Sequence, residues 1–230
     1  MDNTEILFTK TGGIFCRPFA EFREQVLRTR AYLFDWDGVF NDGVKSGAGG
    51  SLFSEVDAMG TNMLRFGHWL KHQHLPVVAV ITGEENPAAQ YLAQREKFNA
   101  IYFKSANKQV AFNHFLEAFS LKENEIAFVY DDVLDLALAG RCGLRIMVRH
   151  AATPTLQQYA IKNELADYIT SGHDHAVRES CELMLASMEK YDEAISRRSA
   201  FDTVYQSYLN ERQSKQAKTF TLKDGMMVGA

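Results

Sequence analysis

The chain has 230 residues, of which 46% are hydrophobic and 23% charged, and its formal net charge is −4. These values are typical of a globular protein with one sizeable core plus appendages. The slightly acidic balance argues against nucleic-acid binding, which normally depends on a basic patch. No apolar run approaches the roughly 20 residues of a membrane-spanning helix, and the N-terminus lacks the apolar stretch of a signal peptide. We therefore expect neither nucleic acid nor a membrane among the partners.

The three cysteines, Cys16, Cys142 and Cys181, are odd in number and far apart in the sequence. Their spacing matches neither a zinc site nor a redox motif. Buried, reduced thiols are the simplest interpretation, and they indicate a cytoplasmic protein.

Residues 1–30 are expected to form an N-terminal extension with an amphipathic helix over 17–30. From residue 31 to about residue 190, apolar runs typical of strands alternate with stretches of helical periodicity. The predicted strands are 33–35, 77–81, 101–103, 126–130, 144–148 and 168–170. The predicted helices are 59–70, 87–98, 108–119, 134–141, 154–165 and a last one from about 176. This alternation predicts an α/β fold, a Rossmann-like parallel sheet between two layers of helices with right-handed crossovers.

Residues 191–230 are predicted to form a C-terminal helical extension and a tail. Apolar residues between 201 and 209 lie on one helical stripe, which either packs on the core or joins subunits. The polar residues after position 212 are expected to be disordered, or to become ordered only with a partner.

Asp35 and Asp37 give the strongest functional signal in the chain. They directly follow the apolar run 31–34, so both carboxylates leave the sheet at its carboxyl edge, where ligands bind in α/β folds. Gly38 comes next and lets the backbone turn tightly. Asp-x-Asp after a strand is often only a turn. Two carboxylates followed by Gly38 favour a metal or phosphate site instead.

Further polar residues occupy the ends of other predicted strands or the starts of helices. They are Thr82, Gly83, Lys108, Asp131, Asp132 and Asp135. This combination suits phosphoryl transfer, which needs a carboxylate nucleophile, a general acid and base, and donors for the phosphoryl oxygens. Several carboxylates at one sheet edge are costly without a cation, so the cluster also predicts a Mg²⁺ site.

The stretches FDWDGVFNDG, VITGEENP, VYDDVLDLAL and GHDHAVRESCELML, together with the region around Lys108, resemble the motifs of a known family. This family is the haloacid dehalogenase (HAD) superfamily of phosphotransferases, and the chain is most similar to its small sugar-acid phosphatases. The resemblance covers residues 31–190, which we take as the phosphatase core.

The resemblance implies catalytic and metal-binding roles for the carboxylates. Asp35 would be the nucleophile, and Asp37 the general acid and base. Mg²⁺ would be held by Asp35, by Asp37 through its backbone carbonyl, and by Asp131. Asp132 and Asp135 would lie next to these ligands and help to position them without binding Mg²⁺ themselves.

The resemblance also implies that Thr82, Gly83 and Lys108 bind the phosphoryl group. The expected activity is Mg²⁺-dependent hydrolysis of a small phosphorylated metabolite, a sugar or sugar-acid phosphate, through an aspartyl-phosphate intermediate.

The spacing between these motifs leaves no room for a globular cap domain. The glycine-rich segment 44–55 is predicted to form a β-hairpin flap, with a mobile surface loop as the alternative. In the similar phosphatases such a hairpin joins a neighbour's site, so the resemblance implies a homo-oligomer, specifically a tetramer.

Two positions depart from the family pattern. Tyr130 replaces a usual glycine and is expected to crowd the metal site. Glu84 replaces a usual basic residue, which predicts poor turnover of substrates that place a carboxylate near it. Both departures favour an alternative hypothesis, a weak or inactive HAD-fold module that acts in assembly or regulation.

A phospho-acceptor receiver domain also combines aspartate, threonine and lysine around magnesium. The order of motifs argues against it, because receivers place the acidic pair first and this chain places it last.

Outside the motifs, His72 and His74 lie in a polar segment at the end of a predicted helix, where solvated side chains are expected.

Overall fold

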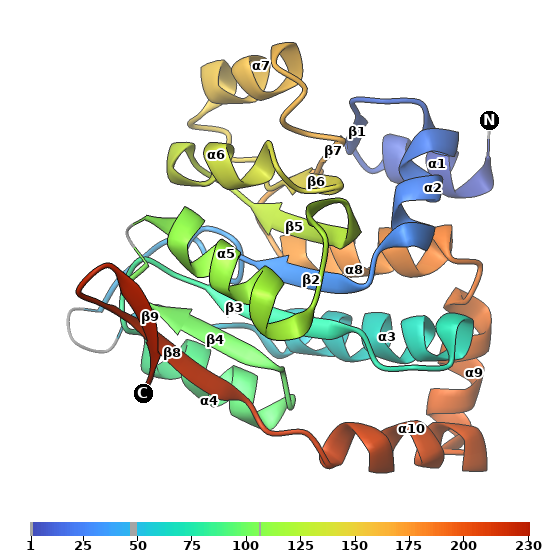
Figure 1. The fold of residues 1–230 in the computed structure, drawn as a ribbon. Coiled ribbons are helices and arrows are strands. Elements are labelled where there is room, and N and C mark those ends of the chain that lie inside the picture. The colour runs from blue at the N-terminus through green and yellow to red at the C-terminus, as the bar shows by residue number, and fades with distance from the viewer. Residues whose placement is uncertain (1, 47–49, 106) are drawn as a thin grey trace.

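The computed structural model describes residues 2–46, 50–105 and 107–230, which form one sheet of nine strands with helices on both faces (Figure 1). The strands are β1 (Ile14–Phe15), β2 (Ala31–Phe34), β3 (Val77–Ile81), β4 (Ala100–Phe103), β5 (Ile126–Tyr130), β6 (Leu144–Met147), β7 (Tyr168–Ile169), β8 (Lys218–Lys223) and β9 (Met226–Gly229). The helices are α1 (Asn3–Lys10), α2 (Phe19–Arg28), α3 (Glu55–His72), α4 (Pro87–Arg95), α5 (Lys108–Phe119), α6 (Leu136–Ala139), α7 (Pro154–Lys162), α8 (Ala176–Ser187), α9 (Tyr191–Ala200) and α10 (Thr203–Gln213). The predicted three-layer α/β fold without a globular cap is confirmed.

The order of strands in the sheet is β1-β7-β6-β5-β2-β3-β4-β8-β9. All neighbours are parallel except the two outermost pairs, β1 with β7 and β8 with β9. From β2 the chain adds β3 and β4 on one side, and then returns to add β5, β6 and β7 on the other. This reversal creates a topological switch point between β2 and β5, which is where α/β sheets bind ligands.

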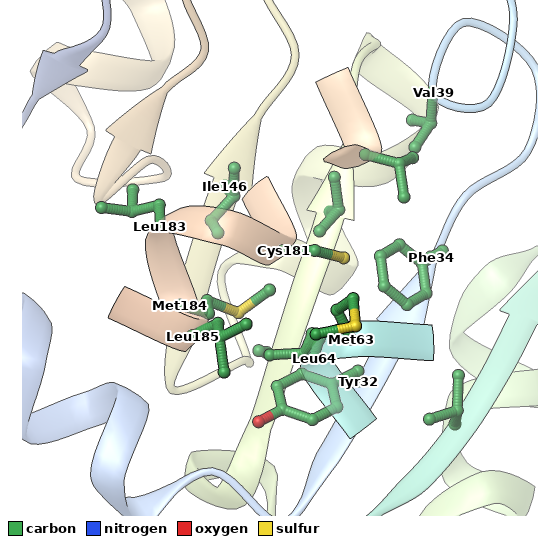
Figure 2. Close-up of a cluster of buried hydrophobic side chains, with 14 of the residues drawn as sticks. Tyr32, Phe34, Val39, Met63, Leu64, Ile146, Cys181, Leu183, Met184 and Leu185 are labelled. Carbon is green, nitrogen blue, oxygen red and sulfur yellow. The ribbon is translucent and has the colours of Figure 1, made fainter. Parts of the chain in front are cut away.

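The sheet separates two hydrophobic cores. Tyr32 and Phe34 of β2 face the core shared with α2, α3 and α8, part of which Figure 2 shows. Ala31 and Leu33 face the opposite core, which includes residues of α5 and α6. Because β2 is buried on both sides, its residues form a continuous apolar run rather than an alternating pattern.

Several predicted elements match the structure at both ends, namely β3, α5 and β5. The helix predicted over 59–70 begins earlier, because the Ser54 side chain accepts a hydrogen bond from the backbone N–H of Val56 and caps α3. The helix expected over 17–30 is α2. The short strand β1 was not predicted, and its antiparallel pairing with β7 joins the N-terminal segment to the sheet.

The C-terminal tail was predicted to be disordered or to become ordered only with a partner, but in the structure it forms two strands of the chain's own sheet. After α10, β8 pairs parallel to β4, and β9 folds back antiparallel on β8 (Figure 1). The Phe220 ring stacks on Tyr102 of β4 with ring centroids 5.1 Å apart. The apolar stripe before the tail packs on the core, since Tyr205 and Tyr208 of α10 are buried.

The flap prediction for 44–55 is not met by the described residues of that segment. Residues 44–46 and 50–54 form no strand, and Glu55 already belongs to α3. Ser46 N donates a 3.1 Å hydrogen bond to Gly50 O, and residues 47–49 of the predicted flap lie outside the described residues. Within the described residues, no helix has the length and apolar character needed to cross a membrane.

Candidate active site

Asp35 and Asp131 follow β2 and β5, so both lie beside the switch point of the sheet. Lys108 begins α5, which follows β4 on the same edge. These residues line a cleft of about 640 Å³, together with Asp135 and His150. The strand order therefore brings together residues that are up to 115 positions apart in the sequence.

Lys108 is the central cation of this cleft. Its ammonium lies 2.5 Å from Asp35 Oδ1 and 2.5 Å from Asp135 Oδ1, and all three side chains are buried. Burial alone would lower the pKa of Lys108, but the two carboxylates outweigh it and the pKa is raised. Burial raises the pKa of Asp35 to about 7, and the Lys108 ammonium opposes this rise. The arrangement keeps Lys108 protonated while two carboxylates compete for its charge.

Asp131 brings a third carboxylate to the same point. One oxygen each from Asp35, Asp131 and Asp135 lie within 4.8 Å of one another. Burial raises the pKa of both Asp131 and Asp135, as expected where neighbouring carboxylates must be charged together. These are hard oxygen donors of the kind that Mg²⁺ prefers. The donor set therefore fits a divalent cation.

Gly38 is required for this geometry. Its φ of +80° is a left-handed conformation that side chains rarely adopt, and a Cβ there would lie 1.9 Å from Asp131 Oδ2. His150 Nε2 lies 3.1 Å from Gly38 O and 3.2 Å from Asp131 Oδ2. The turn after β2 and the loop after β6 thus hold the Asp131 carboxylate between them.

Asp37 is held from the opposite side of the turn. Its Oδ1 accepts a short hydrogen bond from Ser51 Oγ, which itself accepts one from Asn86 Nδ2 at 3.1 Å. Its Oδ2 lies 3.3 Å from Lys45 Nζ. Lys45 also pairs with Glu84 at 2.7 Å. The Asp37 carboxylate is therefore fixed by one hydroxyl and one partly exposed ammonium at the mouth of the cleft.

The proposed phosphate-binding residues lie at the end of β3. Gly83 lines the cleft, and Thr82 is buried beside it, with its Oγ1 accepting a 3.4 Å hydrogen bond from Glu84 N. Asp132 also lines the cleft, but its exposed carboxylate accepts from Val133 N and caps the following 3-10 helix.

The crowding expected from Tyr130 is absent from the described structure. Its side chain is buried in the core that includes residues of α5 and α6, and its hydroxyl donates to Leu165 O at 2.8 Å. The alternation of side chains along β5 directs Tyr130 away from the carboxylates.

Three residues around the carboxylates were not identified from the sequence, namely Lys45, Ser51 and His150. None lies at a predicted strand end with a motif of its own, and Lys45 and Ser51 come from the segment interpreted as a flap. Their proximity to Asp37 or Asp131 depends on how the loops fold back over the sheet edge.

No protein-family model matches the chain. It is similar to curated 3-deoxy-D-manno-octulosonate 8-phosphate phosphatases. The protein from Escherichia coli K12 is 29% identical over 171 residues, covering 72% of this chain and 84% of the relative. The Yersinia pestis protein is 25% identical over 177 residues, covering 74% of this chain and 87% of the relative.

Solved structures share the same fold. A Legionella pneumophila structure described as a HAD superfamily (subfamily III A) hydrolase matches with a TM-score of 0.65 and 27% identity, covering 82% of this chain and 96% of the other. The octulosonate phosphatase of Moraxella catarrhalis, solved with magnesium, phosphate and KDO, has a TM-score of 0.64 and 24% identity, covering 78% and 98%. In sequence and fold, the chain is thus similar to HAD-superfamily hydrolases and to the 3-deoxy-D-manno-octulosonate 8-phosphate phosphatases.

Proposed function

We propose that the chain is a Mg²⁺-dependent phosphatase that hydrolyses a small phosphorylated metabolite, a sugar or sugar-acid phosphate, through an aspartyl-phosphate intermediate on Asp35. The observation that carries this proposal is the group formed by Asp35, Lys108, Asp131 and Asp135 at the switch point. It combines a buried carboxylate nucleophile, an ammonium for the phosphoryl oxygens and a donor set for a cation. The three free cysteines support a reducing, cytoplasmic setting.

In the first step, a carboxylate oxygen of Asp35 attacks phosphorus, and the bond from phosphorus to the sugar oxygen breaks. Asp37 donates its proton to the departing oxygen, so the sugar leaves as an alcohol. Lys108 and the backbone at Gly83 bind the phosphoryl oxygens as charge shifts toward them. Lys108 then exchanges part of its contact with Asp35 for the substrate.

In the second step, Asp37 is a carboxylate and takes a proton from water. The water oxygen attacks phosphorus, the bond to Asp35 breaks, and inorganic phosphate is released. The contacts with Ser51 and Lys45 hold the Asp37 carboxyl group in place for both proton transfers. Glu84 competes for the same Lys45 ammonium.

Asp35, Asp131 and the Asp37 carbonyl would hold Mg²⁺, with Asp135 close enough to contribute a further oxygen. When bound, the cation would neutralise charge on the phosphoryl oxygens and on the clustered carboxylates. One argument for the alternative hypothesis, an inactive module, no longer holds, because Tyr130 does not face the site.

Replacing Asp35 with Asn should lower kcat at least about 1000-fold, because an amide cannot form the acyl phosphate. The fold should be retained, since Asn has nearly the same volume. Turnover of sugar phosphates with Mg²⁺ and a thermal unfolding scan would measure both. The exposed Asp192→Asn variant is a matched control and should keep wild-type turnover. Wild-type rates in Asp35→Asn would refute the assignment of the nucleophile.

Replacing Asp131 with Ala should weaken Mg²⁺ binding at least about tenfold, because one of few protein carboxylate ligands is lost. Calorimetric titration with Mg²⁺ measures this directly. The adjacent Asp132→Ala variant should lose much less affinity, because that carboxylate is exposed and caps a helix. Equal Mg²⁺ affinity in Asp131→Ala and the wild type would place the cation elsewhere.

We further propose that Glu84 selects against substrates with a carboxylate near the cleft mouth. Glu84→Arg should raise kcat/KM for sugar-acid phosphates relative to neutral sugar phosphates by about tenfold, because repulsion is replaced by attraction. Glu85→Arg is the control, since Glu85 pairs with Lys104 and is not among the residues lining the cleft. A wild-type preference for 3-deoxy-octulosonate 8-phosphate over every neutral sugar phosphate would contradict this proposal.

We also propose that the protein is a homo-oligomer, a tetramer by likeness to its family, and that the segment after Gly43 contributes to the interface. Leu52 and Val44 are 73% and 72% exposed next to the cleft, which favours a covered apolar surface. Sedimentation should show an oligomer that Leu52→Asp dissociates. Leu7→Asp, at a 59% exposed leucine of α1, should leave it intact. A fully active wild-type monomer would contradict the proposal.

A further inference from the structure

Three histidines gather at the C-terminal end of α3. His68 and His72 are one helical turn apart on this helix, so they share one face. Gln73 ends the helix in a left-handed conformation with φ of 60°, and the chain then places His74 beside them. The ring centroids are 4.4 Å apart for His68 and His72, 5.3 Å for His68 and His74, and 5.9 Å for His72 and His74. We call this group the histidine trio.

The trio lies far from the acidic cleft. Tyr32, which contacts His68, is near the start of β2, whereas Asp35 follows the end of that strand. Tyr32 and Asp35 are about 10 Å apart along the strand direction, and none of the three histidines is among the residues that line the cleft. The trio therefore cannot take part in phosphoryl transfer and requires its own explanation.

Two ring nitrogens of the trio are buried without a partner. His68 is fully buried, and its Nε2, like Nε2 of His72, makes no hydrogen bond to the described residues. A buried polar atom left without a partner destabilises the fold, so a ligand that paired with these two nitrogens would be favoured. Burial also lowers the pKa of His68 well below its ordinary value and lowers the pKa of His72. Both rings are thus neutral, the form that binds metal.

His68 makes a contact of the kind that orients metal-binding histidines. His68 Nδ1 lies 3.0 Å from the hydroxyl oxygen of Tyr32, which Figure 2 shows pointing away from Phe34. If Nδ1 carries the proton and donates to Tyr32, the lone pair of Nε2 is free. Metal-binding histidines are commonly oriented through such a hydrogen bond from the other ring nitrogen.

The spacing of the rings also fits. Zinc–nitrogen bonds of about 2 Å at tetrahedral angles place the centroids of two bound imidazoles about 5 Å apart. The three measured separations fall on either side of this value. Among the described residues, only the acidic cluster already brings three ligand atoms within 4.8 Å of one another. Binding at the trio therefore requires a rotamer change, which is easiest for the exposed His74.

We propose that His68, His72 and His74 form a second metal site, which binds a zinc-class divalent cation with water as the fourth ligand. Imidazole suits zinc, nickel, cobalt and copper and suits Mg²⁺ poorly. The site would tie the end of α3 to the chain entering β3, and so stabilise the fold rather than supply catalysis.

The test uses the full chain, stripped of metal with a chelator and then saturated with Mg²⁺ to fill the acidic cleft. Calorimetric titration with ZnCl₂ should show one bound equivalent of Zn²⁺. A thermal scan of the Zn²⁺-bound protein should show a higher unfolding temperature. Co²⁺ should give the intense visible absorption of a tetrahedral site. The double variant His72→Gln/His74→Ala should bind Zn²⁺ at least tenfold more weakly. It replaces only the partly exposed and exposed members, so His68 keeps its core packing.

Two controls separate this site from others. His114→Gln, at a histidine paired with Tyr102, should retain the Zn²⁺ equivalent. Asp131→Ala should also retain it, because that substitution affects only the acidic cleft. Equal Zn²⁺ uptake by the double variant and the wild type, loss of uptake in Asp131→Ala, or no uptake at all would each overturn the proposal.

Discussion

The contact on which the site depends is the buried ion group of Lys108 with Asp35 and Asp135. Asp131 brings a third carboxylate oxygen within 4.8 Å of those of Asp35 and Asp135, so the group carries two excess negative charges when all are ionised. Removing charges from water is costly unless they are closely paired, and one lysine cannot balance three carboxylates. A divalent cation would cancel the remaining charge. Metal binding would therefore stabilise the folded arrangement of these carboxylates.

The order of strands in the sheet brings these carboxylates together. β2 and β5 are neighbours although they are about 90 residues apart, and the reversal of strand order between them leaves space above their carboxyl ends. Gly38 is also needed for this arrangement, since any side chain there would collide with Asp131. The Asp37 carboxylate, turned toward Ser51 and Lys45, is kept out of the ion group. The same turn thus separates a nucleophile from a proton donor that is only two residues away.

The sequence predicts this part of the molecule because its signals are local. β3 and β5 are continuous apolar runs, α5 has helical periodicity, and the reactive carboxylates directly follow strands. By contrast, β8 is a half-exposed strand between β4 and β9, and its order comes from pairing with β4, more than 100 residues earlier. Ser51 and Lys45 could not be assigned for a similar reason, because their contacts depend on a loop folding back. Tyr130 was misjudged because its strand position, and not its identity, decides which face it occupies.

Helix α3 makes polar contacts with the rest of the molecule near both of its ends. Near its N-terminal end, Asp57 accepts a 2.9 Å hydrogen bond from Arg178 N and so fixes α3 against the start of α8, while the histidine trio occupies its other end. Carboxylates at the cleft favour a hard cation and imidazoles at the trio favour a borderline one. Because imidazoles bind Mg²⁺ poorly, Mg²⁺ in the cleft would leave the histidine trio available to a zinc-class cation. Zinc also binds carboxylate oxygens, so only zinc in excess of the one equivalent proposed for the trio would compete with Mg²⁺ in the cleft.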